Sequence, residues 1–110
     1  MALHHAGQGE PIDVRPYGAT IGVAQSTALF KSAQLEVLRL VLPAGHRMPP
    51  HQVAGGITVQ CLEGCVEVEA EGRVTMLRAG HLLYLAGEVG HALHALEASS
   101  VLVTIVLQPV

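Results

Sequence analysis

The chain has 110 residues, half of them hydrophobic, and a formal net charge of −3 with its histidines neutral. A chain of this length fits one domain and can bury a hydrophobic core. The six basic residues are scattered along the sequence, so no electrostatic surface for DNA or RNA is expected.

Aliphatic residues dominate the hydrophobic part of the composition, whose aromatic members are Tyr17, Phe30 and Tyr84. With twelve glycines as breaks, this bias favours short strands over helices. No segment approaches the roughly 18–20 unbroken apolar residues of a membrane helix, and the N-terminus lacks the pattern of a secretion signal. We therefore expect a soluble, cytoplasmic protein that does not contact membranes.

The polar residues 1–15, with the pair His4 and His5, are expected to form an exposed arm, and residues 16–110 the folded domain. The first predicted strand, 34–42, has apolar residues on both faces and is interrupted by Arg39. A strand of this kind needs a cover on each side, either a second sheet or a partner subunit.

Six further strands are predicted from alternating residues between turn signals. They cover 57–62, 65–70, 74–77, 82–85, 91–96 and 100–107. In the clearest case Val66, Val68 and Ala70 are expected to point inward, with glutamates between them pointing outward. The last strand is apolar on both faces, like the first. This series, without a strong amphipathic helix, indicates an antiparallel sandwich or barrel.

Two stretches within residues 42–91 carry motifs that resemble the paired motifs of cupins. The first has Gly45, then Pro50 and His51, then VQCLEG at 59–64; the second has Gly80, an aliphatic strand, Gly87 and finally Gly90 with His91. The resemblance implies an all-β, antiparallel, single-domain fold, the double-stranded β-helix or jelly-roll barrel. It also implies that the protein forms dimers, as cupins often do, and that it has a divalent metal site made of three histidines and a carboxylate.

His51 and His91 are the two implied metal ligands that this sequence retains. Val53 and Ile57 stand where the resemblance would place the second histidine and the glutamate. A catalytic transition metal usually has three or more protein ligands, so His46 and Gln60 are weighed as additional donors for Fe, Mn, Ni or Zn. Strand alternation, however, puts Gln60 on the opposite face from Ile57.

The residues Val53, Ile57, Val59 and Cys61 are expected to project inward, where they would line a ligand pocket or fill the barrel core. Tyr84 is expected to point either to that pocket or to a subunit interface. The cysteines Cys61 and Cys65 are expected to be reduced, packed side chains. His81 and His94 are expected to be surface or hydrogen-bonded strand residues.

This pattern favours two alternative functions. The first is a protein that binds a small molecule, with or without a divalent metal, and uses His51 and His91 to orient a polar group of the ligand. The alternative is a metal-dependent enzyme, dioxygenase-like or isomerase-like. A homodimer is expected in both cases, because a barrel this small cannot cover both faces of its apolar strands.

Overall fold

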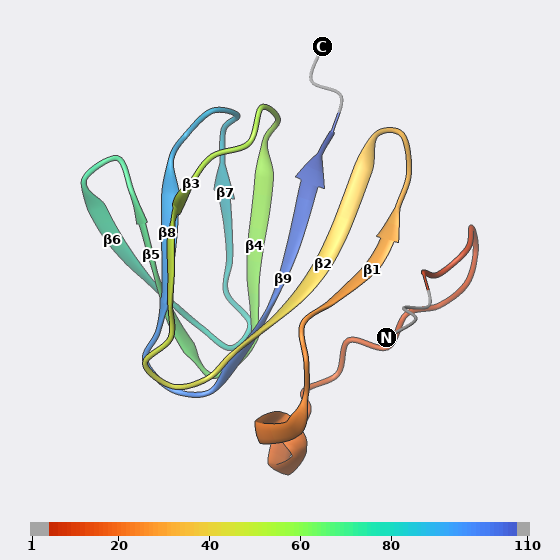
Figure 1. Cartoon of the computed structure of the whole chain (residues 1–110), viewed down its shortest axis with the longest axis horizontal. Coiled ribbons are helices and arrows are strands. Elements are labelled where there is room, and N and C mark those ends of the chain that lie inside the picture. The colour runs from red at the N-terminus through yellow and green to blue at the C-terminus, as the bar shows by residue number, and fades with distance from the viewer. Residues whose placement is uncertain (1–4, 108–110) are drawn as a thin grey trace.

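The structure, a computed structural model, describes residues 5–107 as two antiparallel sheets that pack against each other (Figure 1). Residues 1–4, with His4, and residues 108–110 lie outside the described range. Sheet A has the order β1 (Thr27–Lys31), β2 (Leu35–Leu42), β9 (Ser99–Val106), β4 (Ile57–Glu63), β7 (Leu82–Leu85). Sheet B has the order β3 (Arg47–His51), β8 (His91–Ala95), β5 (Cys65–Ala70), β6 (Arg73–Arg78). The predicted all-β, antiparallel double-sheet architecture is confirmed.

The core lies between the sheets and consists of alternate residues along each strand, those whose side chains point inward. In β4, Ile57, Val59 and Cys61 are buried, whereas Thr58 and Gln60 between them face outward. In β5, Val66 and Val68 are fully buried, as the alternation predicts. Each such aliphatic side chain contributes roughly 1.5–3 kcal/mol to the free energy of folding by leaving water. This burial holds the strand register and decides which residues face the interior.

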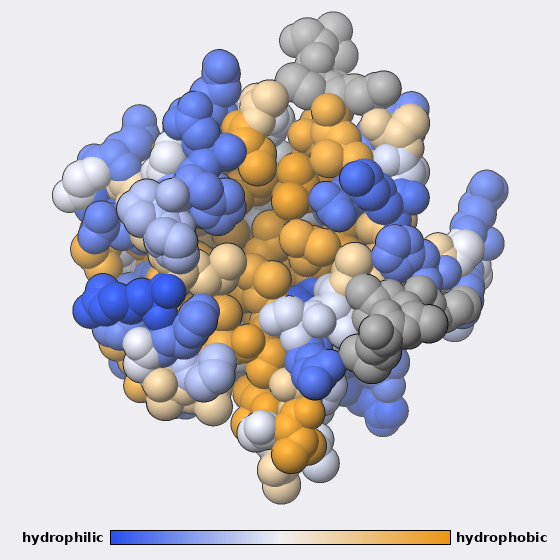
Figure 2. Space-filling model, viewed as in Figure 1, coloured by the Kyte–Doolittle hydropathy of each residue, from blue (hydrophilic) through white to orange (hydrophobic). Residues whose placement is uncertain are grey.

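The outer face of sheet A is also apolar over much of its surface. Leu82 and Tyr84 on β7 are 62% and 69% exposed, and Leu35 and Val106 at the end of the β2–β9 pair are also exposed. A further apolar surface is visible in Figure 2 as a band down the middle of the view, where Figure 1 shows the opening between the two sheets. Sheet A therefore has apolar residues on both faces, as predicted for the first and last strands.

The tight turn between β5 and β6 follows from its two residues. Glu71 and Gly72 have φ values of 53° and 73°. Two successive residues with positive φ form the type I′ geometry that matches the twist of a two-residue hairpin. The turn joins six residue pairs between Cys65–Ala70 and Arg73–Arg78. Strand β6 is therefore longer than the predicted strand 74–77.

Three elements were not predicted from the sequence: β1, β3 and a 3-10 helix at Gly18–Val23. Strand β3 has the sequence RMPPH, and its prolines remove both the alternation signal and two backbone donors. It lies at the edge of sheet B, next to β8, and an edge is where a sheet tolerates proline. The start of the N-terminal segment lies beside β1 of sheet A, where the Ala6 amide donates to the Leu29 carbonyl.

Within residues 5–107, no helix has the length and apolar character needed to cross a membrane.

Candidate ligand site at the paired histidines

A β-bulge in β3 brings His51 opposite His91. Met48 pairs with Leu93, and the next pair joins His51 to His91. An advance of three residues along β3 therefore matches an advance of two residues along β8. The extra residue lies in the segment Pro49-Pro50, where proline cannot continue the ladder. Bulges bend a strand and redirect its side chains. Here the bulge places His51, rather than Pro50, beside His91.

The two imidazole rings are in contact. Their centroids are 4.4 Å apart, with the ring planes tilted by 56°. His91 is buried, with 5% of its surface exposed, whereas His51 is exposed to solvent. On its other side His91 pairs with Ala70, whose methyl group is the smallest side chain after glycine. The pair thus presents one buried and one solvent-exposed imidazole at the same end of sheet B.

Burial, with repulsion from His51 as a smaller cause, lowers the pKa of His91 below its ordinary value of 6.5. A hydrogen bond to the Val89 carbonyl opposes this shift without reversing it. The Nδ1 atom of His91 lies 3.2 Å from that carbonyl oxygen, which can only accept. Nδ1 therefore carries the proton, and Nε2 is left as a free acceptor on a neutral ring.

Two loops close over this end of the molecule, one between β3 and β4 and the other between β7 and β8 (Figure 1). The Glu88 amide donates to the Val53 carbonyl at 2.7 Å. A side chain at Gly87 would collide with the Ala54 carbonyl, so glycine is required for this approach. Gly55 is held in the same way against the backbone of Val106. The histidines therefore lie beneath a packed lip.

The four predicted inward residues divide into two groups. Ile57, Val59 and Cys61 are 4%, 1% and 0% exposed and belong to the packed core, which agrees with the filled-core alternative for these positions. Val53, in the lip, is only partly buried and packs against that core. Of the four, Val53 is therefore the one within reach of a molecule that enters from solvent.

The structure does not bring Tyr84, Gln60 or His46 to the histidine pair. Tyr84 and Gln60 lie on the outer face of sheet A, because the inward positions of their strands are held by neighbours such as Leu83 and Val59. The His46 carbonyl accepts from the Ala95 amide, at the opposite end of β8 from His91. Four strand residues at about 3.3 Å each put His46 roughly 13 Å away.

The structure agrees with the predictions for His81, His94 and the two cysteines. His94 is hydrogen-bonded to Glu67, and the His81 ring accepts from the Arg78 amide. Cys61 and Cys65 are free and buried. Desolvation raises the pKa of the Cys61 thiol, which keeps it protonated and unreactive.

The donor set at the pair does not fit a complete metal centre. Val53 and Ile57 offer no ligand atoms at the positions where the cupin pattern would supply them, and two imidazoles fall short of the usual three or four ligands. Within residues 5–107 no three histidine, cysteine or acidic side chains are grouped to hold a metal ion. The pair is suited instead to direct hydrogen bonding with a ligand.

A second polar cluster, not predicted from the sequence, lies on the outer face of sheet A. Arg39, 3% exposed, donates to the Arg15 carbonyl at 2.7 Å and to Ser100 Oγ at 3.2 Å, and its guanidinium stands 3.9 Å over the Tyr17 ring. Glu63 accepts from the amides of Tyr17 and Gly18. The sequence signal was a single arginine inside an apolar strand, which requires a buried partner.

Comparison with known proteins identifies the fold. No family model matches the sequence, and no curated protein matches it. Solved structures match over nearly the whole chain: a cupin superfamily protein from Desulfitobacterium hafniense has a TM-score of 0.77 at 14% identity, covering 98% of this chain and 100% of its own. An RmlC-like cupin from Shewanella frigidimarina has a TM-score of 0.73 at 18% identity, covering 97% and 93%. A third, an RmlC-like cupin from Desulfovibrio desulfuricans, has a TM-score of 0.69 at 23% identity, covering 96% of each chain.

Proposed function

Because this chain has the cupin fold, we propose that it binds a small molecule at the end of the sandwich where His51 and His91 meet. The observation that carries the proposal is the contact of a buried imidazole with an exposed one. A neutral His91 held by the Val89 carbonyl offers Nε2 as an acceptor, and His51 is free to orient toward the ligand from solvent. The ligand is therefore a small hydroxy acid, whose hydroxyl would donate to His91 Nε2 and whose carboxylate would accept from His51.

The surroundings of the pair support a small, partly apolar ligand. Val53 and the lip residue Gly87 are both partly buried and provide an apolar edge. Small-molecule sites are typically apolar surfaces with a few convergent polar groups. The two imidazoles are those polar groups here, and the hydroxyl and the carboxylate of the ligand would be oriented by His91 and His51 respectively.

A resident catalytic metal is not part of this proposal. The alternative of a metal-dependent enzyme needs a third protein ligand, and neither His46 nor Gln60 lies beside the pair. We expect protein purified without an affinity tag to contain well below one Fe, Mn, Ni or Zn ion per chain, as measured by elemental analysis. One tightly held ion per chain, lost in His91→Ala, would contradict this and support the enzyme.

The binding proposal is tested with a library of small hydroxy acids, screened by NMR against the isotope-labelled protein. We expect hits to shift the imidazole signals of His51 and His91. Loss of one hydrogen bond to a charged or polar ligand weakens binding by about ten-fold, so His51→Ala and His91→Ala should each do so. His46→Ala, at the other end of β8, is the matched control and should bind like the wild type. The absence of hits at the pair, or an equal loss in the control, would refute the proposal.

A further inference from the structure

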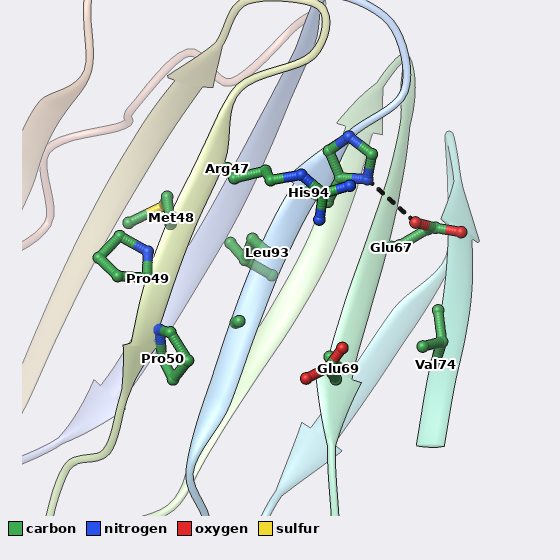
Figure 3. A pocket seen from close by; sticks show the side chains of 10 residues that line it. Arg47, Met48, Pro49, Pro50, Glu67, Glu69, Val74, Leu93 and His94 are labelled. Atoms are coloured by element: carbon green, nitrogen blue, oxygen red, sulfur yellow. Dashed lines mark hydrogen bonds and ion pairs between the residues drawn. The ribbon is translucent and has the colours of Figure 1, made fainter. Parts of the chain in front are cut away.

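A groove of about 360 Å³ lies on the outer face of sheet B, away from the paired histidines (Figure 3). His91 and Leu93 of β8 are buried inward residues, whereas Ala92 and His94 alternate with them and face the groove. The volume falls at the lower end of the range for small-molecule sites. The groove is therefore separated from the proposed ligand site by the thickness of the sheet.

The hollow arises from the small side chain of Ala92. Across the strands Ala92 pairs with Glu69 on β5, and the next outward row joins Arg47, His94 and Glu67. The methyl group of Ala92 lies among longer side chains, with Glu69 beside it on β5 and His94 at the next outward position of β8, and this leaves a depression over Ala92. Its far wall is Val74, which is 59% exposed. The groove thus has an apolar floor and wall beneath a charged row.

The charges around the groove are unequally paired. His94 Nδ1 and Glu67 Oε1 are 3.1 Å apart, so these two side chains satisfy each other. Arg47 and Glu69 have no hydrogen-bond or ion-pair partner among residues 5–107. In Figure 3 the Arg47 side chain extends across β8 toward His94, and Glu69 lies on the other side of the hollow. One free cation and one free anion therefore lie diagonally across it.

We propose that this groove binds a small zwitterion. Its carboxylate would pair with Arg47, whose planar guanidinium suits a carboxylate, and its ammonium group would pair with Glu69. The carbon chain between the two charges would lie over Ala92 and against Val74. Because the two protein charges stand on different strands and in different rows, a linear zwitterion with separated charges fits better than an α-amino acid.

The test uses unbranched ω-amino acids, from glycine to 6-aminohexanoate, with alkylamines and alkanoates of the same lengths as singly charged controls. NMR titration of the isotope-labelled protein follows the Ala92 methyl and the Arg47 side-chain signals. Exposed ion pairs are weak, so we expect the best zwitterion to bind about two- to five-fold more tightly than either singly charged compound. Arg47→Met and Glu69→Gln should each abolish this preference.

Matched controls are Arg78→Met and Glu97→Gln, exposed charges outside the groove whose loss should leave the preference unchanged. His51→Ala should also leave it unchanged, which separates this inference from the proposed function. Retained signal dispersion in each variant shows that it is folded. Equal binding of zwitterions and singly charged compounds, shifts confined to His51 and His91, or equal losses in the control variants would each overturn the proposal.

Discussion

At the scale of single residues, His91 combines burial with a titratable ring. Its pKa is lowered in the folded protein by desolvation first and by His51 second. On unfolding the ring returns to its ordinary pKa, so the unfolded chain binds more protons in the interval between the two values. Stability linked to His91 is therefore present above the ordinary value and is lost as the pH falls through that interval.

This linkage predicts a pH-dependent free energy of unfolding. We expect urea denaturation to show a decrease between about pH 7.5 and about pH 5, and a smaller decrease in His91→Gln, which keeps a hydrogen-bonding side chain without a titrating ring. His46→Gln removes an exposed histidine and should retain the slope of the wild type. An unchanged slope in His91→Gln would show that this ring does not contribute.

At the scale of elements, Glu63 at the end of β4 attaches the N-terminal segment to sheet A. Desolvation raises the pKa of its carboxyl, but hydrogen bonds from Tyr17, Gly18 and Ser100, together with the charge of Arg39, outweigh this and lower it. Arg39 also retains one buried atom, Nε, that has no partner within the described part of the chain. The attachment therefore depends on a carboxylate that compensates a buried guanidinium.

Removal of that carboxylate should loosen the segment and destabilise the domain. We expect Glu63→Ala to lower the free energy of unfolding by about 2–3 kcal/mol, because hydrogen bonds to a charged group are lost and Arg39 stays buried. Amide hydrogen exchange at Tyr17 and Gly18 should become faster. Glu97→Ala, an exposed glutamate, is the control. Unchanged exchange at both amides in Glu63→Ala would contradict this account.

At the scale of the whole molecule, the exposed apolar residues of sheet A lead us to propose a homodimer. Leu82 and Tyr84 continue the outward rows that cross β4 and β9 from Arg39 and Val37, and Arg39 is already covered by Tyr17. A face of this kind can pair with its own copy about a two-fold axis. Large exposed apolar patches are otherwise costly for a monomer.

Light scattering coupled to gel filtration should therefore give twice the mass of one chain. A charge placed on the proposed interface, as in Tyr84→Lys or Leu82→Glu, should shift the protein toward the monomer. Val74→Glu places a charge on a similarly exposed residue of sheet B and should leave the mass unchanged. A monomeric wild type at every concentration measured would refute the homodimer.

The sequence by itself determined the elements whose signals are local. Alternating aliphatic residues between glycine turns were enough for seven strands and for the inward faces of β4 and β5, because burial repeats every two residues along a strand. The motif spacing around His51 and His91 was enough to bring the two rings to one place, which the 4.4 Å contact confirms. Their predicted role as ligand-binding residues stays a prediction.

Only the tertiary structure decided the features that depend on partners distant in sequence. The prolines of β3 hide the strand, and the bulge that aligns His51 is visible only in the pairing with β8. Arg39 needs Glu63 and Tyr17, and the outer groove needs Arg47, Ala92 and Glu69 from three strands. Such neighbours are set by how the sheets pair, and no local period in the sequence encodes that pairing.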